Sequence, residues 1–291
     1  MASEVCEAST IKRRRATKAE MAERAEFLII YAEAHGPVTV RQLYYQAEVQ
    51  GVPGIDKADA AYAKVQRQVL DLRRAGKLAY EHVADATRWM RKPRSFNGIE
   101  EALADTVRLY RKSLWADAES YVEIWCEKDA LAGVIYPITS AYDVPLMVAR
   151  GFSSETFCYE AIAARDGDDR PYYVYYLGDF DRAGQDAARS LEEKLTRFAG
   201  EEGIEVIFEQ IAVTEGQIRE WDLPIRKPKR KSAADKKWPY RFACELDAIP
   251  PDDIRALVED AINRHVDQDR LRILKVAEKS EREQLAKWAK L

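Results

Sequence analysis

The sequence has few cysteines and no grouping of them. The four cysteines, Cys6, Cys126, Cys158 and Cys244, are isolated and form no C-x-x-C pair. This spacing predicts reduced thiols in a cytosolic protein rather than disulfides or a zinc site. The chain also has no apolar run near the roughly 18 residues that cross a bilayer, and its first 15 residues hold no apolar segment typical of a secretory signal. We therefore expect no membrane partner and a cytoplasmic location, or a nuclear one in a eukaryote.

An overall excess of positive charge is also missing, which argues against a nucleic-acid partner when the chain is taken whole. The 46 Lys and Arg against 50 Asp and Glu give a net charge of −4. The distribution is uneven, because residues 1–95 hold 17 basic and 12 acidic residues while the remainder holds 29 and 38. A basic front half on an acidic back half is typical of a DNA-docking domain joined to a carboxylate-rich, metal-binding one. It fits surface charge without function equally well.

The first third of the chain has the pattern of a small helical DNA-binding domain. Residues 1–17 form a basic arm, and residues 18–97 predict three helices followed by two short strands. The expected helices span 18–35, 39–50 and 56–76, and the expected strands span 78–83 and 88–90. Thr39 and Gln42 make a capping box at the start of the second helix. This order is that of a winged helix-turn-helix domain.

After a linking helix at 98–118, the pattern changes to alternating strands and helices. The expected strands span 121–126, 145–148, 172–177 and 206–211, and the helices between them span 129–141, 154–165 and 183–198. A polar insertion at 224–237 and two helices, 252–266 and 270–290, complete a second domain at 119–291. Such alternation predicts an α/β fold with a mostly parallel sheet covered by helices on both faces.

Acidic residues stand at the carboxyl ends of two predicted strands. Glu127 follows the first strand, and Asp179 and Asp181 follow the third. Functional groups gather at this edge of an open parallel sheet, and Mg²⁺ takes a few carboxylate oxygens together with water or phosphate oxygens. The three acids therefore predict a magnesium site. Acids at such positions also cap the following helix, and for Asp129 we prefer that interpretation.

These residues stand in motifs that resemble a Toprim domain, the fold shared by topoisomerases, bacterial primases and some nucleases. The motifs are V-E-I-W-C-E-K-D-A around Glu127, a G-x-x-S-like turn at 151–154, and L-G-D-F-D-R-A-G around Asp179 and Asp181. Within that fold, the E-K-D-A wording most resembles the A subunit of topoisomerase VI and its relatives that make meiotic double-strand breaks. The C-E-L-D-A-I segment at 244–249 is similar to an E-L-E-A-L segment of those proteins. The resemblance implies that Glu127, Asp179 and Asp181 hold the metal.

The same family carries an R-D-I-Y-Y-type motif in its winged domain, and the segment from Arg41 to Tyr45 resembles it. The resemblance implies that Tyr45 attacks DNA and that Arg41 grips the scissile phosphate. Helix geometry independently places Tyr44 on an apolar face and Tyr45 on a more polar one, a turn after Arg41. A phenol needs such help, because its ordinary pKa is near 10. The ordinary alternative is that both tyrosines only pack in the helix.

The resemblance implies magnesium-dependent breakage of double-stranded DNA, with Tyr45 left on a 5′-phosphate, by a nucleoid-associated homodimer. The chain is short, like the stand-alone "mini-A" proteins, and Gln42 replaces the family's acid. Since no phosphate-binding G-x-x-x-x-G-K-[ST] loop is present, strand passage would need a separate ATPase B-type subunit. A hydrolytic Toprim nuclease with a structural Tyr45, and a DNA-binding protein without catalysis, are the alternatives.

Basic residues at two places are candidate contacts for DNA phosphates. One set lies on the third predicted helix and the other in the polar insertion: Lys57, Lys64, Arg67 and Arg74, and Lys229, Arg230 and Lys231. Each neutralised phosphate would add affinity and salt sensitivity. The same charges also suit any surface helix, a solvated loop or a nuclear import signal.

Overall fold

The structure is a computed structural model that describes residues 16–56, 59–84, 93–165, 167–230 and 235–289. Its N-terminal part consists of helices α1 (Lys18–His35), α2 (Val40–Val49) and α3 (Asp59–Arg74). The predicted capping box of the second helix is confirmed: Thr39 Oγ1 accepts the Gln42 N–H at 3.0 Å, and the Gln42 side chain accepts the Thr39 N–H at 2.9 Å. The arm at 1–15 lies outside the described residues.

The predicted first strand of the wing, 78–83, is wrong. Tyr80–His82 is a short 3-10 helix, η1, and Val83 makes only a single parallel bridge with Val38. The second predicted strand, 88–90, lies outside the described residues. The N-terminal part therefore has three helices, and no β-ribbon follows them within the described residues.

Arg73 gives a physical reason for this departure. Its Nη2 donates to the carbonyl oxygen of Tyr80 at 2.9 Å and to that of Val83 at 2.6 Å. The guanidinium also lies 4.8 Å from the centre of the Tyr80 ring. Carbonyls that bond to the end of α3 hold this segment against the helix, so it does not extend into a strand.

A parallel sheet of four strands forms the middle of the molecule, as the alternating pattern predicts. The strands are β1 (Tyr121–Cys126), β2 (Leu146–Val148), β3 (Tyr172–Leu177) and β4 (Val206–Ala212). Among the described residues their order is β2-β1-β3-β4, with Cys126 opposite both Leu177 and Val148. Because all strands run in one direction, β1 and β3 end side by side at the same edge.

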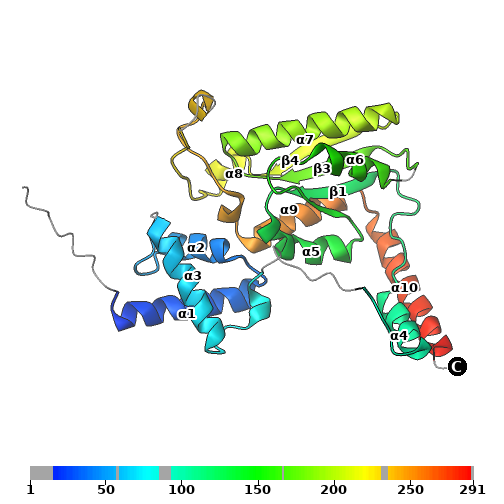
Figure 1. Cartoon of the computed structure of the whole chain (residues 1–291), viewed down its shortest axis with the longest axis horizontal. Coiled ribbons are helices and arrows are strands. Elements are labelled where there is room, and N and C mark those ends of the chain that lie inside the picture. Colours follow the sequence, from blue (N-terminus) through cyan, green and yellow to red (C-terminus); the bar gives the residue numbers. More distant parts are fainter. Residues whose placement is uncertain (1–15, 57–58, 85–92, 166, 231–234, 290–291) are drawn as a thin grey trace, which may run out of the picture.

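Helices cover both faces of the sheet (Figure 1), as predicted. Trp125, Val174 and Tyr176 pack against α6 (Glu155–Ala163) and α7 (Arg182–Glu201). The alternate residues Ile124 and Tyr175 face α5 (Ala132–Ala141) and α9 (Pro251–Asn263). This alternation follows from side chains pointing to opposite faces of a strand. Four short elements complete this part: η2 (Asp129–Leu131), α8 (Glu215–Glu220), η3 (Asp235–Lys237) and η4 (Leu246–Ala248).

The N-terminal helices pack directly against the α5–α9 side of the sheet domain. Leu28 and Leu43 belong to the same buried cluster as Leu246 and Ile254. Arg255 adds polar contacts, because its Nη2 donates to the carbonyl oxygens of residues 35 and 37 at 3.0 and 2.7 Å. The predicted domain boundary near residue 97 therefore does not divide the hydrophobic core.

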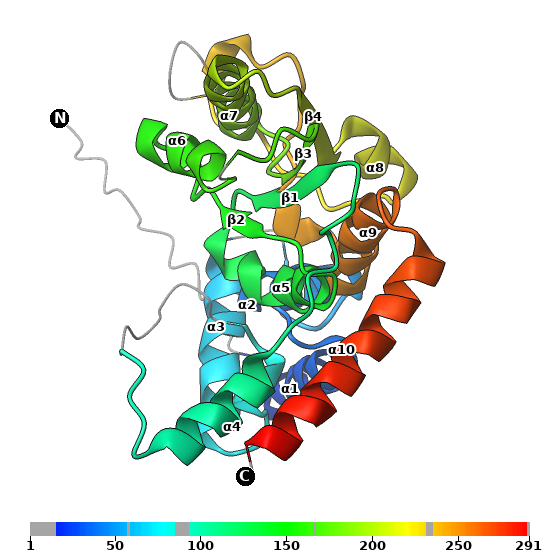
Figure 2. The ribbon, with the colours of Figure 1, turned by 90° about the vertical axis from the view of Figure 1, so that its right-hand side faces the viewer.

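The linking helix is shorter than predicted. Helix α4 (Ile99–Leu109) ends before Tyr110, whose side chain bonds to Glu281 of the long C-terminal helix α10 (Gln268–Trp288). The two helices lie side by side and extend from the sheet domain (Figure 2). No helix in the described ranges is long and apolar enough to cross a membrane.

Candidate active site

Glu127 and Asp179 meet at the carboxyl edge of the sheet. The Asp179 N–H donates to Glu127 Oε2 at 2.8 Å, and the Glu127 N–H donates to the carbonyl oxygen of Leu177 at 2.8 Å. Gly178 makes this approach feasible, since a Cβ there would lie 2.9 Å from Glu127 Oε2 and 2.4 Å from the Tyr176 ring. The sequence prediction that these two acids converge is consistent with this geometry.

The surroundings of these two acids raise the pKa of each carboxyl group above its ordinary value. Burial, followed by the charge of Asp179, raises the pKa of Glu127 from 4.5 to about 7. Burial also raises the pKa of Asp179, while Lys128 opposes that shift. Two adjacent, partly desolvated carboxylates repel each other, and a bound cation would relieve that repulsion.

Asp181 caps a helix in this structure. Its Oδ1 accepts the Gly184 N–H at 2.8 Å and begins α7. Gly184 is required here, because a Cβ would lie 2.3 Å from the carbonyl oxygen of Asp179. Asp129, for which we preferred a capping role, instead pairs with Arg150 at 3.4 Å.

Lys128 is the centre of a cluster of opposite charges. Its Nζ lies 2.8 Å from Asp179 Oδ1, 2.8 Å from Asp247 Oδ2 and 3.6 Å from Glu245 Oε2. Burial lowers the pKa of Lys128, but the carboxylates, Asp247 first, outweigh it and raise the pKa above its ordinary value. Glu245 in turn binds Arg41 Nη1 and Arg226 Nη1, each at 2.7 Å. We call these six residues the Lys128 cluster.

Charge balance in this region favours a divalent cation. The Lys128 cluster is neutral, with three cations and the three carboxylates Asp179, Glu245 and Asp247. Glu127 and Asp181 have no ion pair with any residue in the described ranges. Their second oxygens, like Asp179 Oδ2, accept no hydrogen bond there. Two uncompensated carboxylates beside a third suit the hard-oxygen preference of Mg²⁺.

The acidic side chains of the described residues do not form a complete metal-binding site. Within the described ranges, no three His, Cys, Asp or Glu side chains form a group that could hold a metal ion. The Asp181 carboxylate is engaged through Oδ1 by the Gly184 N–H. Binding would require this side chain to rotate or to contribute its second oxygen.

Both tyrosines of the second helix are buried. The prediction that Tyr44 belongs to the core is confirmed, and its hydroxyl donates to the carbonyl oxygen of Asp56 at 2.9 Å. Tyr45, which we predicted on the more polar face of the helix, is also buried, since only 1% of it is exposed. Its hydroxyl is buried and has no hydrogen-bond partner among the described residues. Burial, followed by Glu245, raises the pKa of Tyr45 far above 10, and Arg226, Lys128 and Arg41 oppose that shift.

Arg226, and not Arg41, stacks over the ring of Tyr45. The Arg226 guanidinium lies 5.1 Å from the centre of the Tyr45 ring, whereas that of Arg41 lies 4.5 Å above Tyr62. Residues 226 and 243 bridge through their backbones, which holds Arg226 over α2. Tyr45 is thereby connected to Asp179 through Arg226, Glu245 and Lys128 of the same chain.

A cleft of about 550 Å³ opens beside this cluster, between the N-terminal helices and the edge of the sheet. Arg41, Lys128 and Glu245 line one part of it, and Tyr62 and Arg73 of α3 line another. The cleft is large enough to admit part of a polymer backbone.

The predicted DNA-contact residues that the structure describes do not line this cleft. Lys64, Arg67 and Arg74 lie about 100–180° around α3 from Tyr62 and Arg73, at about 100° per residue. Lys64 donates to the carbonyl oxygen of Gly54 at 2.8 Å, and Arg67 and Arg74 are exposed. Lys57 lies outside the described residues.

The basic insertion gives a mixed result. Arg230 holds its own loop, donating to the carbonyl oxygens of Lys236, Trp238 and Tyr240 at 3.1–3.2 Å. Lys229 is exposed, and Lys231 lies outside the described residues. Arg226, at the start of the insertion, is the residue that reaches the site.

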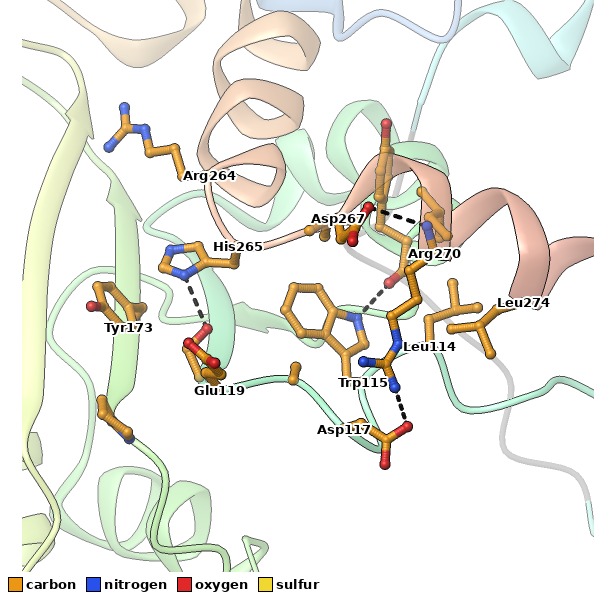
Figure 3. Close-up of a pocket in the computed structure, with 16 residues that line it drawn as sticks. Leu114, Trp115, Asp117, Glu119, Tyr173, Arg264, His265, Asp267, Arg270 and Leu274 are labelled. Carbon is orange, nitrogen blue, oxygen red and sulfur yellow. Dashed lines mark hydrogen bonds and ion pairs between the residues drawn. The ribbon is translucent and has the colours of Figure 1, made fainter.

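A larger cavity, about 670 Å³, lies at the opposite edge of the sheet (Figure 3). His265 bonds there to Ser120 Oγ through Nδ1 at 3.0 Å and to the Tyr175 hydroxyl through Nε2 at 2.6 Å. Arg270 pairs with Asp117. Burial, followed by the charge of Arg264, lowers the pKa of His265. These mutual pairings favour a packing role.

No family model matches the chain, and no curated protein matches it.

The raised pKa of Glu127 gives a testable pH dependence. Because the folded-state pKa of about 7 exceeds the ordinary 4.5, the folded protein binds this proton more tightly than the unfolded one. Stability should therefore fall as pH rises from about 4.5 to about 7 and change no further above that range. Without magnesium, Glu127→Gln should raise Tm by a few degrees at about pH 8 and leave it unchanged near pH 4.5. A Tm difference independent of pH, measured by calorimetry, would contradict this assignment.

Proposed function

We propose that the chain cleaves DNA by transesterification, with Tyr45 as the nucleophile and Mg²⁺ held by Glu127, Asp179 and Asp181. The observation that carries the proposal is the pair of uncompensated carboxylates, Glu127 and Asp181, that flank Asp179 at the carboxyl edge of parallel strands. We also propose that the N-terminal helices belong to a winged helix-turn-helix domain and that the sheet belongs to a Toprim domain of the topoisomerase VI A type. The three N-terminal helices and the parallel sheet support it.

In this reaction the Tyr45 oxygen forms a bond to phosphorus while the bond from phosphorus to the 3′-oxygen breaks. The phenolic proton leaves to solvent, the 3′-oxygen takes up a proton, and the 5′-phosphate remains esterified to Tyr45. Arg226, Lys128 and Arg41 favour the phenolate against the effect of burial. Bound magnesium would supply positive charge for the phosphate and the leaving oxygen.

Cleavage by variants of the three acids tests this proposal. Asp179→Asn, Asp181→Asn and Glu127→Gln should each abolish magnesium-dependent cleavage of supercoiled plasmid at ordinary magnesium concentrations, because each removes a negative ligand. The matched control is Asp129→Asn, since Asp129 pairs with Arg150 and is not a proposed ligand. Normal cutting by all three variants would reject the magnesium site.

The burial of Tyr45 favours a second candidate, a hydrolytic nuclease in which Tyr45 is structural. In that reaction water replaces the phenol as the nucleophile, and no protein remains on the DNA. A covalent protein–DNA product therefore distinguishes the two candidates.

The proposal extends to duplex DNA as substrate, to a homodimer and to a separate ATPase subunit for strand passage. In the resembling family, the tyrosine of one protomer meets the acids of the other. If subunits exchange freely in a mixture of Tyr45→Phe and Glu127→Gln proteins, about half of the dimers are mixed. A site shared between protomers leaves one intact site in each mixed dimer and gives nicks in one strand, whereas a site within one chain leaves none. A mixture without nicking activity, despite mixed dimers detected by mass, would exclude sharing.

A further inference from the structure

Three cations converge on one carboxylate beside Tyr45. Arg41 Nη1 binds Glu245 Oε2 at 2.7 Å, Arg226 Nη1 binds Glu245 Oε1 at 2.7 Å, and Lys128 Nζ lies 3.6 Å from Oε2. Arg41 comes from α2, Lys128 follows β1, and Arg226 belongs to the insertion. We call Arg41, Arg226 and Lys128 the cation cradle.

The contacts of Glu245 are those that a phosphodiester would make. Arginine binds carboxylates and phosphates through the same planar donors, and both anions present two oxygens. The Glu245 side chain is 22% exposed, and those of Arg41 and Arg226 are 31% and 35% exposed. The group therefore borders solvent, and Arg41, Lys128 and Glu245 line the cleft of about 550 Å³.

Exchange of Glu245 for a phosphodiester would preserve the charge of the Lys128 cluster. Each anion carries one negative charge, so the cradle remains balanced while Glu245 turns into the cleft. Asp179 and Asp247 keep their bonds to Lys128 at 2.8 Å. The Arg226 guanidinium covers the Tyr45 ring at 5.1 Å, and the Tyr45 hydroxyl has no partner among the described residues. A phosphate that binds Arg226 would therefore lie on the side of Tyr45 that this guanidinium covers.

We propose that Arg41, Arg226 and Lys128 form the binding site for the scissile DNA phosphate, and that Glu245 occupies this site in the free protein. Glu245 then competes with DNA, and its displacement frees the cation cradle for the phosphate. This inference deepens the proposed function and rests on it, and it adds Arg226 and Glu245 to the residues that determine DNA binding.

The test measures the affinity of the full chain for a short DNA duplex in EDTA, where magnesium-dependent cleavage does not interfere. Glu245→Gln removes the competing charge and keeps a side chain of the same size. We expect it to bind the duplex about tenfold more tightly at low salt, because an opposing charge near the phosphate is lost. The double variant Glu245→Gln/Arg226→Gln should lose this gain.

Glu209→Gln is the matched control. Glu209 binds Arg264 through both carboxylate oxygens, at 2.7 and 3.0 Å, in an exposed pair that does not line this cleft. It should change the affinity less than twofold. An equal gain in this control would assign the effect to net charge and overturn the proposal.

A second measurement tests the proposal even if the Glu245→Gln protein does not fold. In the otherwise unchanged protein, Arg226→Gln should reduce the slope of log affinity against log salt by about one, whereas Arg264→Gln should not. An unchanged slope for Arg226→Gln, or an unchanged affinity of folded Glu245→Gln, would reject the cation cradle as the binding site of the scissile phosphate.

These outcomes separate the inference from the proposed function. A covalent adduct at Tyr45 together with unchanged Glu245→Gln affinity would reject the cradle alone. Tighter binding by Glu245→Gln without any adduct would support the phosphate site and reject the transesterification.

Discussion

Tyr45→Phe should abolish covalent attachment to DNA, reducing adducts by at least about a thousandfold, while leaving DNA binding nearly unchanged. The variant lacks the oxygen that forms the bond to phosphorus. It should also be as stable as the original protein or slightly more stable, because the Tyr45 hydroxyl is buried without a partner among the described residues. Adduct yield on a detergent gel and thermal unfolding measure the two effects.

Tyr44→Phe is the matched control, because it removes the same atom from the adjacent residue. Adducts should persist. Stability should fall by about 1 kcal/mol, since the bond from the Tyr44 hydroxyl to the Asp56 carbonyl, 2.9 Å long, is lost. Adducts in purified Tyr45→Phe, or their loss only in Tyr44→Phe, would reject the assignment of the nucleophile.

Lys128→Met should be the most destabilising single substitution in the site. It leaves Asp179 and Asp247 without the ammonium that lies 2.8 Å from each. Breaking a largely buried ion pair from one side costs about 3 kcal/mol or more, measured as the free energy of unfolding in urea. Lowering the pH should recover part of that loss, because the stranded carboxylates can then take up protons.

Lys112→Met serves as the control for Lys128→Met. Lys112 pairs with Glu281 at 2.7 Å, but both side chains are partly open to solvent. Water can solvate Glu281 after the ammonium is lost, so the free energy of unfolding should change little. Equal effects of the two substitutions would show that the Lys128 cluster does not hold the site together.

The sheet domain could be predicted closely from the sequence. The strand 121–126 is a short β-branched and aromatic run, and strand 172–177 is its counterpart, so both begin and end as expected. Helix starts followed from capping residues such as Thr39. The prediction of a strand at 78–83 was wrong because this segment bonds to Arg73. That is a tertiary interaction, which the local pattern of the sequence does not contain.

The site could be predicted only in part. Strand ends identified Glu127 and Asp179, because parallel strands finish at one edge. The Lys128 cluster was missed as an arrangement, since Arg41 and Glu245 are 204 positions apart in the chain and meet only in the folded protein. One sequence feature indicated that these residues matter: Lys128 and Glu245 each lie in a motif that resembles the topoisomerase family, E-K-D-A and C-E-L-D-A-I.

The burial of Tyr45 could not be predicted for a related reason. Helix periodicity assigned a face to Tyr45 from the sequence of α2 alone. That face is not open to solvent, because Arg226 from the other half of the chain covers it. A pattern along one helix cannot report which distant segment packs on it.

One measurement tests the central claim most directly. Supercoiled DNA is incubated with the protein and magnesium, the reaction is stopped with detergent, and the protein–DNA product is digested for mass spectrometry. The account predicts a nucleotide joined through its 5′-phosphate to the peptide that contains Tyr45, and its absence when magnesium is chelated. Cut DNA that carries no protein, or a nucleotide on another residue, would contradict it.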